Sequence, residues 1–170
     1  MKNILLSTFL FLSIHTFGQT MNKIIIEKEN KPVLIGRCNV KGLNKIPEFA
    51  EAITIQYLYY EPDTLVLKSL KPLLKDVKII LVMGTWCDDS KLHVPHFLKI
   101  MDKLAYKTNK LNIICVNHEK KTAGKEIEGL NIIRVPTFIF YRAGKEIGRI
   151  TESPQKNLET DMFNMLSQQK

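Results

Sequence analysis

Three apolar segments and a turn along the chain predict the four strands of a central sheet. Residues 77–83 and 111–116 are almost entirely apolar, which is typical of strands buried on both faces. Residues 137–141 form a third run of this kind. The Arg-Ala-Gly segment at residues 142–144 then predicts a tight turn into a fourth strand at residues 145–150. The pattern therefore predicts two strands separated by a helix-length segment, followed by a hairpin.

Apolar residues three and four positions apart predict helices between and after these strands. The first predicted helix carries on one face Val94, Phe97, Leu98, Met101, Leu104 and Ala105. Residues 122–128 predict a short helix that Gly129 closes. A last helix is predicted to be capped by Ser153 and Pro154 and to bury Leu158, Met162, Phe163 and Leu166. This order predicts an α/β protein with a central mixed β-sheet that is flanked by helices and covered on both faces.

The first third of the chain predicts additional elements ahead of this sheet. Residues 23–27 and 33–37 are β-rich and flank a turn, which indicates a hairpin. Residues 46–60 show helical spacing, with Pro47 in the first turn. A leucine-rich helix follows at residues 65–74, and Pro72 should end or kink it.

The first 18 residues have the pattern of a secretory signal peptide. Lys2 precedes a short apolar run, and small residues stand before Gln19, as at a signal-peptidase cleavage site. The alternative is an N-terminal membrane anchor, but this run is shorter than the roughly 20 residues that span a bilayer. We therefore expect an exported protein with no integral membrane segment once the signal is removed.

Charge and composition exclude few other classes of protein. The whole chain has a formal net charge of +8, and removing residues 1–18 takes away one lysine and no acid. The basic residues form no arginine-rich stripe, so we expect no nucleic-acid binding. We expect a monomer.

Cys87 is the most informative candidate for chemistry. It stands where the strand at residues 77–83 ends and the next helix begins. Unpaired amide groups at a helix N-terminus favour a thiolate, and the thiolate is the nucleophile of disulfide exchange. The alternative is a buried, unreactive cysteine, which is common for a lone thiol.

The surrounding motif resembles the thioredoxin superfamily. The resemblance rests on Trp86-Cys87-Asp88-Asp89-Ser90, on Pro95 within the helix, and on Val135-Pro136-Thr137 before a strand. It covers roughly residues 62–168 and implies a thioredoxin fold. For an exported protein, the resemblance also implies a location in the bacterial periplasm. A cis-proline loop at Val135, Pro136 and Thr137 would then face Cys87 and bind the substrate's backbone. The implied division is a signal peptide at 1–18, an N-terminal extension at 19–61 (hairpin plus helix) and a thioredoxin-like domain at 62–170.

Two departures from the family pattern bear on activity. Ser90 stands where the family has its resolving cysteine, which gives a CxxS motif, and a hydroxyl cannot displace a disulfide. Leu81 stands where thioredoxins carry a buried aspartate. Asp88 and Asp89 stabilise a helix start but repel a thiolate at Cys87. The alternative role of Asp88, Asp89 and Ser90 is helix capping alone.

The remaining cysteines and the histidines offer weaker alternatives. Cys115 lies in a predicted strand and is expected to be a core residue. Cys38 could pair with Cys87 if the extension folds back over the motif. His93 and His96, near Cys87, could form a metal site, but their spacing matches no recognised ligand pattern, so we predict surface histidines, no metal and no cofactor.

Two functions lead from the sequence, ahead of a third, a metallochaperone that would use Cys87 and the nearby histidines. The first is an exported monothiol thioredoxin-like protein, which would act by thiol-disulfide exchange or isomerisation through Cys87. Its partners would be protein or small-molecule thiols and disulfides. The second is a redox-inactive thioredoxin-fold module that binds polypeptides beside Trp86 and Pro136. Only the first would be an enzyme, a thiol-disulfide oxidoreductase or isomerase.

Overall fold

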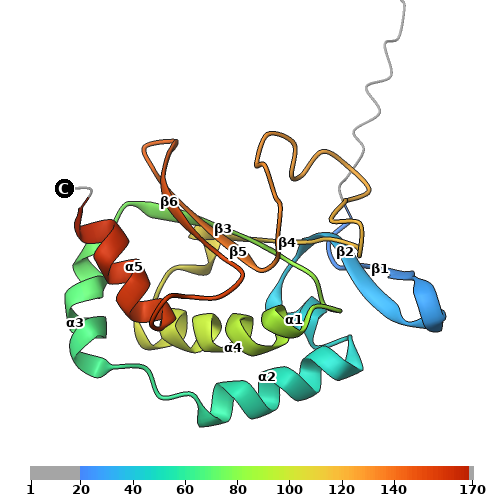
Figure 1. The fold of residues 1–170 in the computed structure, drawn as a ribbon, viewed down its shortest axis with the longest axis horizontal. Coiled ribbons are helices and arrows are strands. Elements are labelled where there is room, and N and C mark those ends of the chain that lie inside the picture. Colours follow the sequence, from blue (N-terminus) through green and yellow to red (C-terminus); the bar gives the residue numbers. More distant parts are fainter. Residues whose placement is uncertain (1–19, 169–170) are drawn as a thin grey trace, which may run out of the picture.

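The computed structural model describes residues 20–168, so the predicted signal peptide lies outside the described residues. Six strands form one mixed sheet in the order β1-β2-β4-β3-β5-β6 (Figure 1). β3 and β4 are parallel, and every other neighbouring pair is antiparallel. The strands are β1 (Lys23–Ile26), β2 (Pro32–Cys38), β3 (Val77–Met83), β4 (Leu111–Cys115), β5 (Thr137–Arg142) and β6 (Lys145–Thr151).

The longer helices lie together on one side of this sheet, and residues 116–136 lie on the other (Figure 1). The α-helices are α1 (Val40–Leu43), α2 (Pro47–Tyr59), α3 (Thr64–Leu73), α4 (Asp88–Lys103) and α5 (Leu158–Ser167). Two 3-10 turns, η1 (Lys28–Asn30) and η2 (Thr108–Lys110), precede β2 and β4. α3 ends one residue after Pro72, as the sequence predicts.

The two faces of the sheet are covered in different ways. Side chains alternate along β3, so Ile79, Leu81 and Met83 join the main core under the helices. Ile80 and Val82 face the other way, into a smaller cluster with Val116, Val135, Ile127, Leu130 and Ile132. Both faces of the sheet are therefore covered, as the sequence predicts, and an irregular segment rather than a helix covers the second face.

The short helix predicted at residues 122–128, within this irregular segment, is not formed. The structure has bends and turns there, with single-turn bonds from Glu128 N to Lys125 O and from Leu130 N to Ile127 O. Thr122 Oγ1 donates to Gly124 O (3.0 Å), a local bond that competes with helical pairing. A seven-residue helix containing a glycine has little stability of its own.

Two helix ends also differ from the prediction. Ala105 is exposed and has φ 52° beyond the end of α4, so it does not belong to the buried helix face. α5 begins after Asn157, whose side chain accepts from Thr160 N (2.9 Å). Ser153 and Pro154 are therefore not its cap, and Phe163 is only half-buried.

The predicted N-terminal hairpin is present and joins the central sheet directly. β2 pairs with β4, with Gly36 opposite Cys115 and Cys38 opposite Ile113. At the end of α2, Tyr60 Oη donates to Glu159 Oε2 of α5 (2.5 Å). Residues 20–60 therefore share the sheet and the core with the rest of the chain.

Candidate functional site

Cys87 occupies the junction between β3 and α4, as the sequence predicts. It is the N-cap residue of α4, with an extended backbone (φ −83°, ψ 127°). Its carbonyl accepts the first helical bond from Lys91 N (2.9 Å), and its own N–H donates to Gly84 O (3.1 Å). The side chain is half-buried and makes no capping bond. The thiol therefore lies at the positive end of the α4 dipole, where an anion is favoured.

The loop before β5 lies directly against this thiol. Cys87 Sγ donates to Val135 O at 3.1 Å, although the two residues are 48 positions apart. The Val135–Pro136 peptide is cis, and Pro136 O accepts from Glu152 N at 2.7 Å. Thr137 is buried, and its Oγ1 donates to Arg134 O (2.6 Å), so its side chain faces its own loop. The predicted motif and the predicted loop thus meet at Cys87 and Val135.

Ser90 is buried and takes no part in capping. Its Oγ accepts from Gly84 N at 3.4 Å, which ties the end of β3 to the first turn of α4. This bond contradicts the alternative in which Ser90 only caps the helix. It also leaves the hydroxyl inside the protein, whereas the Cys87 side chain is only half-buried.

The two aspartates of the motif differ in their surroundings. The Asp88 side chain is 96% exposed and pairs with Lys91 Nζ (3.2 Å). Asp89 is half-buried. Partial burial lowers the pKa of Lys91, but hydrogen bonds to Asp88 and Glu48 outweigh it and hold the pKa above its usual value. Lys91 therefore stays charged and offsets part of the negative charge beside Cys87.

Trp86 is held at one edge and on one face of its ring. Its Nε1 donates to Val116 O (2.9 Å), and the ring stacks on His118 with centroids 4.4 Å apart. His118 Nδ1 pairs in turn with Glu27 Oε2 (2.5 Å). A Cβ at Gly84 would lie 2.5 Å from the indole, so the glycine leaves the space that Trp86 needs. The tryptophan thus presents a fixed aromatic surface next to Cys87.

A comparison with known proteins finds a relative for part of this chain. The chain is 31% identical over 85 residues to a thioredoxin-like protein of Acanthamoeba polyphaga mimivirus, a match that covers 50% of this chain and 59% of the viral protein. This match supports a thioredoxin-like relationship. No family model matches the chain. The match with the viral protein spans less than two thirds of that protein's length.

Two solved structures resemble the fold at 12% sequence identity. One is a Pseudomonas aeruginosa protein of unknown function (TM-score 0.56, 78% of this chain and 91% of that one). The other is an HIV epitope-scaffold protein (TM-score 0.54, 78% of this chain and 84% of that one). At this identity the likeness concerns the fold alone.

Cys38 lies on the opposite face of the sheet from Cys87. Cys38 and Cys115 are both buried in the main core, on the adjacent strands β2 and β4, whereas Cys87 packs against the smaller cluster. Burial, with a contribution from Cys38, raises the pKa of the Cys115 thiol. The hypothesis that Cys38 pairs with Cys87 is therefore wrong, because the sheet separates them.

His93 and His96 are half-buried rather than solvated surface residues. His96 stacks on Tyr60 with centroids 3.9 Å apart, and its Nε2 lies 3.2 Å from Gln56 Oε1. His93 Nε2 lies 3.3 Å from Ser153 Oγ. Burial lowers the pKa of His96 to about 4. Within residues 20–168, no three His, Cys, Asp or Glu side chains gather as a metal site.

Sequence reasoning missed a groove beside the motif. The groove is about 550 Å³ in volume and is bounded by residues of the extension, of the Trp86 motif and of the end of β4. We call it the extension groove; its lining is Glu29, Lys31, Pro32, Val33, Ile46, Pro47, Glu48, Thr85, Trp86, Asp88, Lys91 and His118. No local signal announces it, because its walls lie far apart in the sequence.

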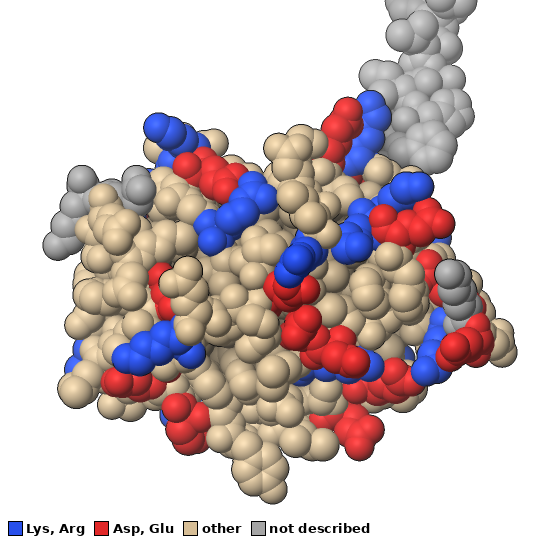
Figure 2. Space-filling model, viewed as in Figure 1, with Lys and Arg blue, Asp and Glu red and all other residues tan. Residues whose placement is uncertain are grey.

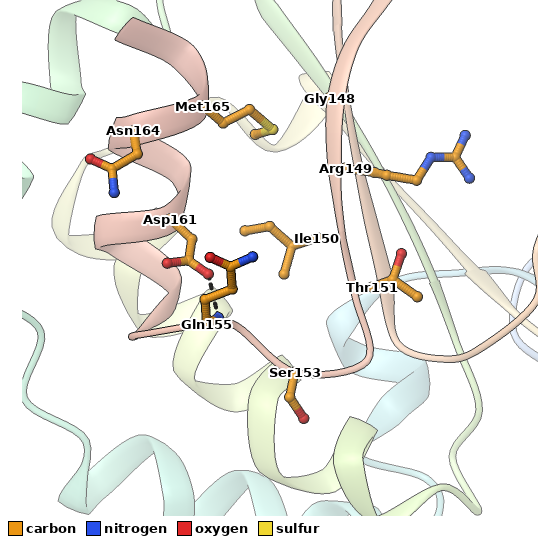
Figure 3. Close-up of a pocket in the computed structure, with 9 residues that line it drawn as sticks. All are labelled: Gly148, Arg149, Ile150, Thr151, Ser153, Gln155, Asp161, Asn164 and Met165. Atoms are coloured by element: carbon orange, nitrogen blue, oxygen red, sulfur yellow. Dashed lines mark hydrogen bonds between the residues drawn. The ribbon is translucent and has the colours of Figure 1, made fainter. Parts of the chain in front are cut away.

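A second hollow, of about 420 Å³, lies between β6 and α5 and holds no thiol (Figure 3). Asp161 faces Gln155 there and accepts its backbone N–H (2.6 Å). Arg149 points away from the hollow and pairs with Glu146 (2.6 Å). These polar groups already have partners, so the hollow offers less for chemistry than the surroundings of Cys87.

In the described part of the chain, no helix is long and apolar enough to cross a membrane.

Proposed function

We propose that this protein has a thioredoxin fold and acts by monothiol thiol-disulfide exchange through Cys87. The observation that carries the proposal is the position of Cys87 Sγ. The sulfur is half-exposed at the N-terminus of α4 and 3.1 Å from Val135 O. The thioredoxin-like relationship supports the same assignment.

The exchange is balanced at each step. Cys87 loses its proton to solvent, and its thiolate attacks one sulfur of a partner disulfide. A Cys87–partner disulfide forms, the partner's S–S bond breaks, and the leaving thiolate takes a proton from water. A second thiol, from the partner or from a small-molecule thiol, then attacks the mixed disulfide and frees Cys87. The sequence of steps isomerises or exchanges disulfides without net oxidation.

Ser90 explains why the release step needs an outside thiol. Its hydroxyl is buried and accepts a hydrogen bond from Gly84 N. A hydroxyl also does not displace a sulfur from a disulfide, because the nucleophile of the exchange is a thiolate. Cys38 and Cys115 lie across the sheet and cannot reach Cys87 without unfolding. A mixed disulfide on Cys87 should therefore persist until a free thiol arrives.

The test is adduct formation with 2-hydroxyethyl disulfide, followed by mass spectrometry of the folded protein. We expect one adduct, on Cys87, that a small thiol removes. Cys87→Ser should abolish the adduct. Cys115→Ser is the control: it removes another free thiol, one that is buried, and should leave the adduct unchanged. An adduct that forms only in urea would refute the proposal.

The second candidate is a redox-inactive module that binds polypeptides. One observation favours it: the Cys87 thiol is engaged in a hydrogen bond to Val135 O of the protein's own loop. Under this alternative, a folded protein without adducts would still bind extended peptides, and Cys87→Ser would bind them equally well.

We also propose that the protein is exported. Support comes from the signal-peptide pattern of residues 1–18. N-terminal sequencing of the protein from its native source should give Gln19 as the first residue, and a start at Met1 would contradict export.

A further inference from the structure

The extension groove lies on the other side of Cys87 from Val135. β3 leads to Cys87, and it stands between β4 and β5 in the sheet. Val135 immediately precedes β5, whereas the groove is built from His118 after β4 and from the start of β2, the next strand out. The β1–β2 hairpin can be followed beside the end of β4 in Figure 1. A partner seated on Cys87 therefore has the cis-proline loop on one side and the extension on the other.

The rim of the groove is a chain of charges that alternate in sign. Glu29 pairs with Lys31 (3.8 Å), Lys31 with Glu48 (3.4 Å), Glu48 with Lys91 (3.2 Å), and Lys91 with Asp88 (3.2 Å). Both lysines thus stand between two carboxylates. Hydrogen bonds from Lys91 and Lys31 lower the pKa of Glu48, which keeps it ionised. This row of charges begins and ends with a carboxylate, so its three acids and two lysines leave one uncompensated negative charge.

The floor of the groove is largely apolar. Pro32, Val33, Ile46, Pro47 and the indole of Trp86 contribute to it. A long aliphatic stem can cover such a floor while its charged end stays at the rim. The whole chain is strongly basic, and Figure 2 shows acidic and basic side chains interleaved over the face drawn. The negative excess at this rim is therefore a local departure from the charge of the protein.

We propose that the extension groove selects exchange partners that carry a positive charge next to the reacting sulfur, such as a peptide with Lys or Arg beside its cysteine. The inference rests on the proposed function and names the substrate class of the same site. The cation would lie near Asp88, whose carboxylate is 96% exposed and closest in sequence to Cys87. An anion is disfavoured, because Lys31 and Lys91 are each held by two carboxylates.

The test compares three small disulfides of different charge: cystamine (positive), 2-hydroxyethyl disulfide (neutral) and dithiodipropionate (negative). The measured quantity is the ratio of rate constants for adduct formation at Cys87. A ratio cancels the fraction of Cys87 that is thiolate, so it is independent of the ionisation of the thiol in each variant. In the parent, we expect cystamine to react faster than the neutral probe. Part of this excess in rate comes from attraction between the cation and the Cys87 thiolate, and the rest comes from the groove.

Two variants separate the groove from that background. Asp88→Asn should lower the cystamine-to-neutral ratio about two- to five-fold at low salt, and 1 M salt should remove the difference. Glu48→Gln frees both lysines from a shared partner, so it should also raise the dithiodipropionate-to-neutral ratio. Asp76→Asn is the matched control: this exposed acid precedes β3, at the far end from Cys87, and should leave both ratios unchanged.

Equal ratios in the parent, Asp88→Asn and Glu48→Gln, with adducts still forming, would overturn this inference and leave the proposed function intact. Absence of adducts with all three probes would overturn the proposed function and this inference with it.

Discussion

The bond between Tyr60 and Glu159 should fasten the end of the extension to the last helix. Glu159 is only 1% exposed, and its carboxylate accepts from Tyr60 Oη (2.5 Å) and from Asp63 N (3.0 Å). Tyr60 is the C-cap residue of α2, and Glu159 lies in the first turn of α5. Burial, together with the carboxylate, raises the pKa of Tyr60, so the phenol remains a donor at every pH in ordinary use.

Tyr60→Phe removes the hydroxyl and keeps the ring that stacks on His96. A hydrogen bond to a charged group contributes about 1.5–3 kcal/mol, and one oxygen of a buried carboxylate loses its partner in the variant. Because Tyr60 itself is partly exposed, we expect a loss of about 2 kcal/mol in the free energy of unfolding. For a domain of this size that corresponds to about 4–8 °C in Tm.

Urea unfolding followed by circular dichroism measures this change. The matched control is Tyr59→Phe, at a neighbouring tyrosine that is 77% exposed, and it should change stability by less than about 0.5 kcal/mol. The double variant with Glu159→Gln should lose much less than the sum of the two single changes. Equal stability of Tyr60→Phe and Tyr59→Phe, or full additivity in the double variant, would refute the reasoning.

Three further predictions concern the thiols, the motif loop and the response to pH. A polar alkylating reagent should label only Cys87 in the folded protein and all three thiols after unfolding, because Cys38 and Cys115 are 6% and 0% exposed. Peptide mapping that finds Cys38 or Cys115 labelled in the folded state would contradict their burial. Gly84→Ala should lower stability by about 1–3 kcal/mol in urea unfolding, since its Cβ would meet the Trp86 ring at 2.5 Å, and unchanged stability and indole fluorescence would show that the ring is not confined. Burial lowers the pKa of His96 to about 4, so between pH 6.5 and 4 the folded state binds fewer protons than the unfolded state. The contribution of neutral, buried His96 to the free energy of unfolding is therefore fully present above pH 6.5 and is lost as the pH falls towards 4. The free energy of unfolding of His96→Gln should fall by about 1 kcal/mol less than that of the parent between pH 6.5 and 4, after a discount for the partial exposure of His96. Identical pH profiles of the two proteins in urea unfolding would show that His96 is solvated.

Local pattern was sufficient for the elements that carry the motif. The apolar runs at residues 77–83 and 111–116 correspond to β3 and β4, and Cys87 lies at the strand–helix junction that its neighbours predict. These features depend on side chains close together in the sequence, such as the period of a helix face or the length of a buried strand. The same reasoning failed at residues 122–128, where Thr122 and Gly124 favour a local turn and packing against the second face replaces a helix.

The sequence by itself determined the strands, the main helices and the place of one thiol at a helix start. Only the tertiary structure decided what surrounds that thiol: Val135 O lies 48 residues from Cys87, and Glu48 reaches Lys91 across 43 residues. It also decided that Cys38 lies across the sheet, because the pairing of β2 with β4 fixes the face on which Cys38 lies. Such contacts depend on strand register and on the closing of long loops, and neither leaves a periodic trace in the chain.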